Sequence, residues 1–376
     1  MLDTTLENAT GTLENILRQI SEQSSRKADY IAPTDQIQVV TRDGNTNIVM
    51  EANKGMPTQQ FVTNEVAFNQ LAANCDLDVR TARRLRDNAN YSREFDNLVN
   101  KILVNEPKNK MLRTFDGEFP LVRAIVSDKF KTFDNVDLVQ AALPQLLESD
   151  AQWQIVNGTI TDQRLYMRLK SKNQIAEPVV GDRVSNGVML RNSETGHGSC
   201  EVSQLFWTLA CLNGMTSQNT SRHTHVTSSR GTDEWALLTN EAKEADNLSL
   251  RLKLRDITAN MADTANFEKT VEQFRLAHGD IVENGLANPS AIVDSVVQVL
   301  KLSKKSSDDV MAGLMQTIQQ AGYTNKPISR ATLCNALTAV SHKVDADSVD
   351  EWQSHGRTLL DLPRNQWETI AQTPLA

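Results

Sequence analysis

The sequence predicts an α+β fold, in which an antiparallel, hairpin-rich central sheet with helices is followed by an all-helical C-terminal region. Between about residues 110 and 192, apolar residues recur with a period of two, which is typical of strands. After residue 233 they recur with helical spacing, and nowhere do strands and helices alternate as in a doubly wound parallel sheet. We therefore expect three regions: residues 1–58, an N-terminal helix and short strands; residues 59–232, an α+β core; and residues 233–376, a helical region.

The first region begins with an amphipathic helix over residues 1–27, whose last residues, SEQSSRK, suggest a flexible joint. The apolar side chains at helical spacing are Leu6, Leu13, Ile16, Leu17 and Ile20. Short strands are expected over residues 28–58, around a turn at Asp43-Gly44-Asn45. Residues 63–88 then have the outline of a helix-turn-helix, with Thr63 or Asn64 as the cap of the first helix.

The central region is expected to contain several strands and two helices. The strand candidates are residues 110–115, 121–127, 152–157, 163–171 and 187–192. One helix is expected over residues 135–147, and a second should begin near Ser203 and carry the apolar run LFWTLACLNG. The C-terminal region should form helices over residues 233–262, 265–284, 290–302, 307–321, 329–343 and 347–360, with caps at Ser290, Ser307 and Ser329.

Composition excludes several classes of protein. With 39% hydrophobic and 23% charged residues, the 376-residue chain is neither disordered throughout nor a membrane protein, since no apolar run approaches the length of a spanning helix. The N-terminus lacks the basic and apolar segments of a signal peptide. The four cysteines form no CxxC pair, so we expect no disulfide scaffold and a reducing cytoplasm, that of a bacterial host.

The net charge of −8 is unevenly distributed. Residues 1–79 hold 5 basic and 11 acidic side chains, and residues 233–376 hold 14 and 20, so each end carries −6. Residues 80–232 hold the remaining 20 basic and 16 acidic side chains, a balance of +4. A basic centre between acidic ends is compatible with a defined anion-binding groove, although ordinary variation in composition also explains it.

The sharpest local pattern is QRLYMRLKSK, residues 163–172. In a strand, alternate side chains share a face, which here places four cations and one aromatic ring on the solvent side: Arg164, Tyr166, Arg168, Lys170 and Lys172. Their spacing of about 6.6 Å is close to that of phosphates along an extended single strand, and an interleaved ring can stack on a base. The alternative is the ordinary solvated face of an antiparallel strand.

Two further basic groups are candidates for nucleic-acid contacts. Arg80, Arg83, Arg84 and Arg86 lie on the second helix of the helix-turn-helix outline, although such helix pairs are common in other proteins. Arg123, Lys129 and Lys131 flank a strand and the turn that follows it, where Asp128 and Asp134 could pair with them structurally.

Metal binding and catalysis find weaker support. Five potential ligands fall within 29 residues, but their spacing matches no common zinc pattern: His197, Cys200, Cys211, His223 and His225. The chain lacks GxxxxGK[ST], GxSxG and GxGxxG motifs, and GHGS at residues 196–199 fits a tight hairpin loop as well as an anion-binding nest. We therefore expect no cofactor, no resident metal and no enzyme chemistry.

Three segments in order resemble a phage- and plasmid-like protein family known as a domain of unknown function. They are FNQLAANCDLDVRTARRL, RTFDGEFPLVRAIVSDKFKTFDNVDL, and GVMLRNSETGHGSCEVSQLFWTLACLNGM with the following SRHTH. The resemblance covers about residues 60–230, whereas residues 1–58 carry no family motif and Trp207 stands where a basic residue is expected. It implies a setting in mobile DNA and a core similar to that of single-strand annealing recombinases, an analogy of fold.

Together these observations lead us to expect a phage- or plasmid-encoded single-stranded DNA-binding protein that acts in replication, recombination or transcription. Its DNA contacts would come from Arg164, Tyr166, Arg168, Lys170, Lys172, Arg123, Lys129, Lys131, Arg83 and Arg84. The helical C-terminal region would serve self-association or recruit replication, recombination or transcription proteins. The alternatives are a protein-binding factor that inhibits or recruits a host or phage enzyme, and a metal-dependent enzyme using His197, Cys200, His223 and His225.

Overall fold

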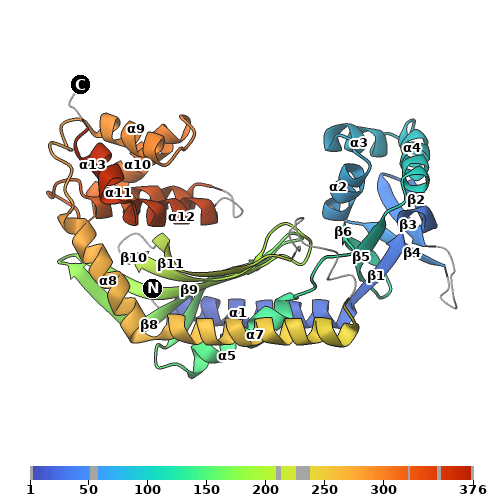
Figure 1. Ribbon diagram of the computed structural model, residues 1–376, viewed down its shortest axis with the longest axis horizontal. Coiled ribbons are helices and arrows are strands. Elements are labelled where there is room, and N and C mark those ends of the chain that lie inside the picture. Colours follow the sequence, from blue (N-terminus) through green and yellow to red (C-terminus); the bar gives the residue numbers. More distant parts are fainter. Residues whose placement is uncertain are drawn as a thin grey trace.

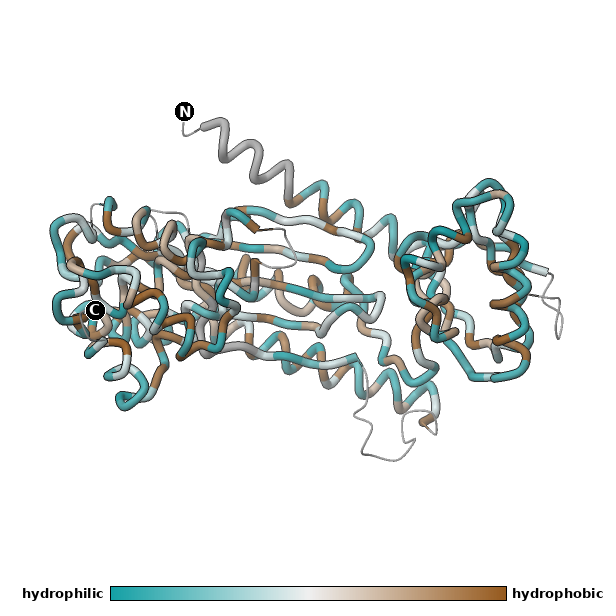
Figure 2. The backbone as a smooth tube through the Cα atoms, turned by 90° about the horizontal axis from the view of Figure 1, so that it is seen from above, coloured by the Kyte–Doolittle hydropathy of each residue, from teal (hydrophilic) through white to brown (hydrophobic). Residues whose placement is uncertain are grey.

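The computed structural model describes residues 3–50, 58–208, 213–225, 238–320, 322–344 and 349–373. It confirms an α+β fold with a hairpin-rich antiparallel sheet and a helical C-terminal region. The described residues form two sheets, which lie in two lobes that Figure 1 shows side by side. Seen from above in Figure 2, the N-terminal lobe lies at one end of the molecule and the C-terminal helices lie at the other.

The N-terminal lobe is built on a six-stranded sheet of order β1-β5-β6-β4-β3-β2, in which only the β4–β6 pair is parallel. Its strands are β1 (Lys27–Pro33), β2 (Ile37–Arg42), β3 (Asn45–Met50), β4 (Gln59–Thr63), β5 (Asn109–Phe115) and β6 (Leu121–Ser127), with the 3-10 turn η1 (Thr34–Gln36) after β1. Because β3 and β4 pair, this sheet draws strands from both sides of the expected boundary between residues 58 and 59.

Three helices cover one face of this sheet: α2 (Glu65–Asn74), α3 (Val79–Arg86) and α4 (Ser92–Asn105). Asn64 caps α2 and Asp78 caps α3, each accepting a hydrogen bond from the backbone N–H three residues later. The expected pair of helices with a short turn is therefore confirmed. Their apolar side chains pack with those of α4 and the sheet in one core, which includes Phe68, Phe95 and Leu112.

The second lobe contains a five-stranded antiparallel sheet of order β11-β10-β9-β8-β7. Its strands are β7 (Trp153–Ile160), β8 (Leu165–Val179), β9 (Asp182–Asn192), β10 (Cys200–Thr208) and β11 (Asn213–His223). One face packs on α1 (Asp3–Arg26), α5 (Asn135–Glu148) and α7 (Asn240–Ala262), which run beneath the sheet in Figure 1. The expected joint at residues 21–27 is wrong, since α1 continues to Arg26 and β1 begins at the next residue.

The helix expected from Ser203 is also wrong, because residues 200–208 form the strand β10. Every residue of β10 is buried, and it pairs with β9 and β11 on its two sides. A strand packed on both faces loses the alternation of polar and apolar residues, so its apolar run was indistinguishable from a buried helix.

The C-terminal region is helical in its described residues, as expected, and packs against the end of the five-stranded sheet through Val184, Phe206 and Met215. Its elements after α7 are α8 (Thr264–Gly279), α9 (Pro289–Val299), α10 (Ser306–Ile318), α11 (Arg330–Ala339), η2 (Val340–His342), α12 (Val349–Leu360) and α13 (Arg364–Ala371). The last helix, α13, was not expected. No helix in the described ranges combines the length and the apolar character needed to cross a membrane.

Candidate functional site

The cations of β8 and its neighbours share one face of the five-stranded sheet. Tyr166 of β8 lies directly opposite Arg191 of β9, which lies opposite Glu201 of β10, which in turn lies opposite Arg222 of β11. Since directly paired residues project to the same face, this row continues across four strands. Arg168 belongs to the same face, because it follows Tyr166 by two residues along β8.

The expectation that these β8 side chains form a solvent-exposed stripe is wrong for Tyr166 and Arg168. Their exposed fractions are 1% and 6%. The reason is that β8 is an interior strand with both faces packed. Leu165, Met167 and Leu169 contact the helices on one side, while Tyr166 and Arg168 are buried on the other. Tyr166 is therefore inaccessible to a base in this conformation.

The remaining basic residues of this stripe are more accessible. Arg164 is half-buried, and its Nη1 donates to the hydroxyl of Tyr166 at 3.0 Å while its Nε donates to the carbonyl of His197 at 2.7 Å. Lys170 is half-buried, and burial lowers the pKa of its ammonium group. Lys172 is exposed. The accessible part of the stripe therefore lies towards Lys170 and Lys172.

An apolar cluster of Met189, Leu205 and Trp207 adjoins these cations. Arg168 lies opposite Met189, and Lys170 lies opposite Gly187. The indole of Trp207 occupies the space above Gly187, where an added Cβ would lie 2.2 Å from its Nε1. The absence of a side chain at Gly187 thus lets the large ring lie flat on the sheet.

Helix α3 carries the second basic group. Arg83 and Arg86 both pair with Glu65 of α2, at 3.2 and 2.6 Å, so the structure joins these two cations to the neighbouring helix. Arg80 and Arg84 are exposed. In Figure 1, α2 and α3 lie on the side of the N-terminal lobe that faces the C-terminal helices.

Arg123, expected to contact DNA, is instead buried at the junction of the lobes and paired with Glu194. The prediction failed because a central strand of the first sheet places this residue against the loop that follows β9. Lys131 pairs with Asp246 of α7 at 3.0 Å, and Lys129 is half-buried. The third basic group is thus spread over separate environments.

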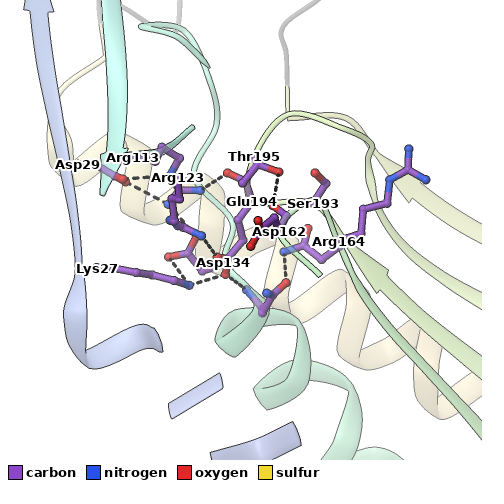
Figure 3. A network of polar contacts seen from close by, with 12 residues as sticks. Lys27, Asp29, Arg113, Arg123, Asp134, Asp162, Arg164, Ser193, Glu194 and Thr195 are labelled. Atoms are coloured by element: carbon purple, nitrogen blue, oxygen red, sulfur yellow. Dashed lines mark hydrogen bonds and ion pairs between the residues drawn. The ribbon is translucent and has the colours of Figure 1, made fainter. Parts of the chain in front are cut away.

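The same junction contains a network of buried and partly exposed charges that sequence reasoning missed (Figure 3). The chain passes between the lobes where α1 joins β1 and where β6 leads to α5. Lys27 stands at the first crossing and Asp134, which caps α5, at the second, with their charged atoms 3.4 Å apart. Arg113 of β5, only 1% exposed, links the two crossings. It pairs with Asp29 of β1 at 2.9 Å and with Asp134 at 2.8 Å.

Glu194 completes this network from the loop between β9 and β10. Its carboxylate accepts hydrogen bonds from Lys27, Arg123 and, at 2.6 Å, the backbone N–H of Asn135. Its backbone carbonyl accepts from Arg113 at 2.9 Å. The network therefore holds three cations and three carboxylates, and these charges balance.

The electrostatic effect of the network is clearest at Asp134. Burial by itself raises the pKa of this carboxyl, but Arg113, Lys27 and Arg123 outweigh burial and hold the pKa well below its ordinary value. The opposite charges likewise keep the pKa of Arg113 above its ordinary value in spite of burial. Asp134 and Arg113 are therefore charged at neutral pH, and the network joins the two lobes.

A small cavity of about 40 Å³ adjoins the network, lined in part by Arg123, Arg164, Asn64 and Glu194. Arg123 has two buried nitrogens, Nε and Nη2, without a hydrogen-bond partner in the described structure. One water molecule needs about 10–15 Å³ of cavity volume, so a few waters would fit in this cavity and accept hydrogen bonds from the two nitrogens of Arg123. The cavity is too small for a nucleotide.

The loop that contains the GHGS run, residues 196–199, is fixed by hydrogen bonds to its surroundings. Gly196 has φ of +82°, a conformation that favours glycine. The side chain of Ser193 accepts from the N–H of His197 at 2.8 Å, and Gln70 of α2 donates to the carbonyl of Thr195 at 2.7 Å. Because the loop presents carbonyl oxygens to Arg164 and Gln70, these contacts are those of a tight structural loop and not of an anion nest.

The potential metal ligands among the described residues lie in two places. His197 lies in this loop, whereas Cys200, His223 and His225 lie near the other edge of the sheet, and Cys211 lies outside the described residues. In the described part of the chain, no three His, Cys, Asp or Glu side chains are grouped so that they could hold a metal ion. Burial raises the pKa of the Cys200 thiol well above its ordinary value.

Comparison with known proteins adds one finding. Neither the curated proteins nor the solved structures contain a match to this chain. The expected resemblance to a domain of unknown function is confirmed over a different range from the one expected, beginning in β6 and ending just beyond α8. Residues 122–284 match the model of an uncharacterised family, the domain of unknown function DUF932.

Proposed function

We propose that the protein binds single-stranded DNA, holding the strand mainly by its phosphates. The observation that supports this proposal is the accumulation of cations on one face of the five-stranded sheet. Arg168 and Lys170 alternate along β8, Arg164 directly precedes this strand, and the strand register adds Arg191 and Arg222 to the same face. Lys172 extends the row at an exposed position. Glu201 is the one carboxylate in the row that the register defines from Tyr166 to Arg222.

The burial of the central cations decides which of them contact the strand. Arg168 and Tyr166 are buried, so they support the surface from within, and the accessible side chains Lys170 and Lys172 make the phosphate contacts. Exposed Arg80 and Arg84 on α3 provide a second set of contacts on the N-terminal lobe. Binding through phosphates without base readout is sequence-tolerant and weakens with salt.

The finer parts of the proposal concern the biological setting. The protein acts in replication, recombination or transcription of phage or plasmid DNA within the bacterial cytoplasm, and it promotes the annealing of complementary strands. The C-terminal helices serve self-association or recruit other proteins of these processes. No chemical step is part of this proposal.

Fluorescence anisotropy with a labelled oligonucleotide, as single strand and as duplex, tests the proposal. The informative variant is Lys170→Gln/Lys172→Gln, because both side chains are accessible and neither substitution leaves a buried charge unpaired. Arg168→Glu is unsuitable, since a carboxylate buried at that position would disturb folding. The matched control is Lys304→Gln/Lys305→Gln, which removes two exposed lysines from the C-terminal region.

We expect preferential binding of the single strand, weakened by the β8 variant and unchanged in the control. Each phosphate contact contributes a salt slope of about 0.7, so removal of two cations should lower the slope by about 1.4. The annealing role predicts faster pairing of complementary labelled strands in the presence of the protein. Absence of binding to either form at low salt would refute the proposal and favour a protein partner.

A further inference from the structure

A larger cavity lies at the opposite edge of the five-stranded sheet, where β11 ends. Its volume is about 340 Å³, and three separate segments line it. Lys131 comes from the turn after β6, Arg222 and His223 come from the end of β11, and Asp246 and Lys253 come from α7. Small-molecule sites usually measure about 300–1,000 Å³, so this cavity is large enough for a small ligand, unlike the one beside Arg123.

The charges around this cavity are predominantly positive. Lys131 and Asp246 pair at 3.0 Å and offset each other. Within the described structure neither Arg222 nor Lys253 forms an ion pair, and Arg222 donates from Nε to the hydroxyl of Ser199 at 2.8 Å. The cavity lining thus contains the cations Lys131, Arg222 and Lys253 and the single carboxylate of Asp246, an excess of positive charge.

Burial and the positive charge around the cavity both lower the pKa of His223. Its pKa is lowered chiefly by burial, and Lys253 and Lys131 lower it further. Its Nε2 lies 3.0 Å from the hydroxyl of Ser221. The other titratable groups that line the cavity are Arg222, Asp246, His225 and the buried thiol of Cys200. An anion in the cavity would stabilise the protonated ring and raise the pKa of His223.

We propose that this cavity binds a phosphate monoester through Lys253, Arg222 and His223. A phosphate monoester carries about −1.5 to −2 charges at pH 7 and three acceptor oxygens, which match the excess of cations in the lining and a ring donor. The group could belong to a free phosphate compound or to the 5′ end of a DNA strand, since the same chemistry recognises both. Arg222 also belongs to the row of cations on the sheet, but Lys253 and His223 do not, so this site is tested separately from strand binding at Lys170 and Lys172.

The test uses the full chain labelled with ¹³C at histidine Cε1, with His223 assigned by comparison with the His223→Asn variant. Inorganic phosphate is titrated at constant ionic strength, with chloride as the balancing salt. We expect a saturable shift of the His223 resonance and a higher pKa for its ring in the presence of phosphate. Lys253→Gln should weaken phosphate binding about fivefold or more, whereas the exposed-lysine variant Lys304→Gln should leave it unchanged.

A second arm compares oligonucleotides that carry a 5′-phosphate or a 5′-hydroxyl. Saturation by inorganic phosphate, or by the 5′-phosphorylated strand alone, supports the site and identifies its source of phosphate. The proposal is overturned if neither shifts His223, or if chloride produces the same shift. It is also overturned if Lys253→Gln leaves the saturation curve unchanged. Anisotropy with the 5′-hydroxyl strand reports the β8 surface separately, so either proposal can fail alone.

Discussion

Replacing Glu194 with glutamine should destabilise the protein strongly, because it removes one charge from the balanced network between the lobes. Glu194 is 3% exposed and accepts hydrogen bonds from Lys27, Arg123 and the N–H of Asn135. In Glu194→Gln, three cations would face two carboxylates, leaving one uncompensated buried positive charge. Breaking a buried pair in this way costs about 3–5 kcal/mol, which corresponds to a decrease of about 10²- to 4 × 10³-fold in the folding equilibrium.

Urea denaturation followed by circular dichroism measures this loss. With an m-value of about 3 kcal/mol/M, the midpoint should fall by about 1 M or more. The matched control is Glu268→Gln, the same substitution at an exposed position of α8, which should change the free energy of unfolding by less than about 0.5 kcal/mol.

A double variant separates charge balance from lost packing. Lys27→Met/Glu194→Gln restores the balance, with two cations against two carboxylates, so part of the lost stability should return. The reasoning would be refuted if Glu194→Gln alone cost less than about 1 kcal/mol, or if the double variant lost the sum of the two single changes.

Three further predictions concern acid stability, packing and thiol reactivity. The folded state holds the pKa of Asp134 below its ordinary value, so the ionised carboxylate stabilises the protein above about pH 4 and this stabilisation is lost at lower pH. In Asp134→Asn, the urea midpoint should therefore fall less steeply on acidification than in the unchanged protein. Gly187→Ala should lower the free energy of unfolding by about 1–3 kcal/mol, because the added Cβ displaces Trp207. Gly279→Ala should not destabilise the protein, because its added Cβ would have no atom within 4 Å. Thermal melts of the two variants measure the difference. Burial raises the pKa of Cys334 to about 12, so its alkylation, followed by peptide mass spectrometry, should require unfolding.

Local sequence patterns were sufficient to predict most elements. Period-two runs identified β5 to β9, and the expected caps Asn64 and Ser329 begin α2 and α11. Such signals lie within a few residues of the element they specify, so no knowledge of the tertiary structure is needed. Failures occurred where burial removed the signal, as in β10, whose residues are buried throughout.

The surroundings of the candidate site could be predicted only in part. The cations of β8 were identified from alternation, but alternation does not reveal that the face of Tyr166 and Arg168 is packed. The charge network joins Lys27, Arg113 and Glu194, which are far apart in the sequence. No local pattern relates such residues, since their pairing follows from the way two lobes meet.

The most direct test of the proposed function is the salt dependence of single-strand binding, measured by anisotropy for the unchanged protein and for Lys170→Gln/Lys172→Gln. The account predicts tighter binding of the single strand than of the duplex, and a salt slope that falls by about 1.4 in the variant. Equal slopes for the two proteins, or no binding at low salt, would contradict it.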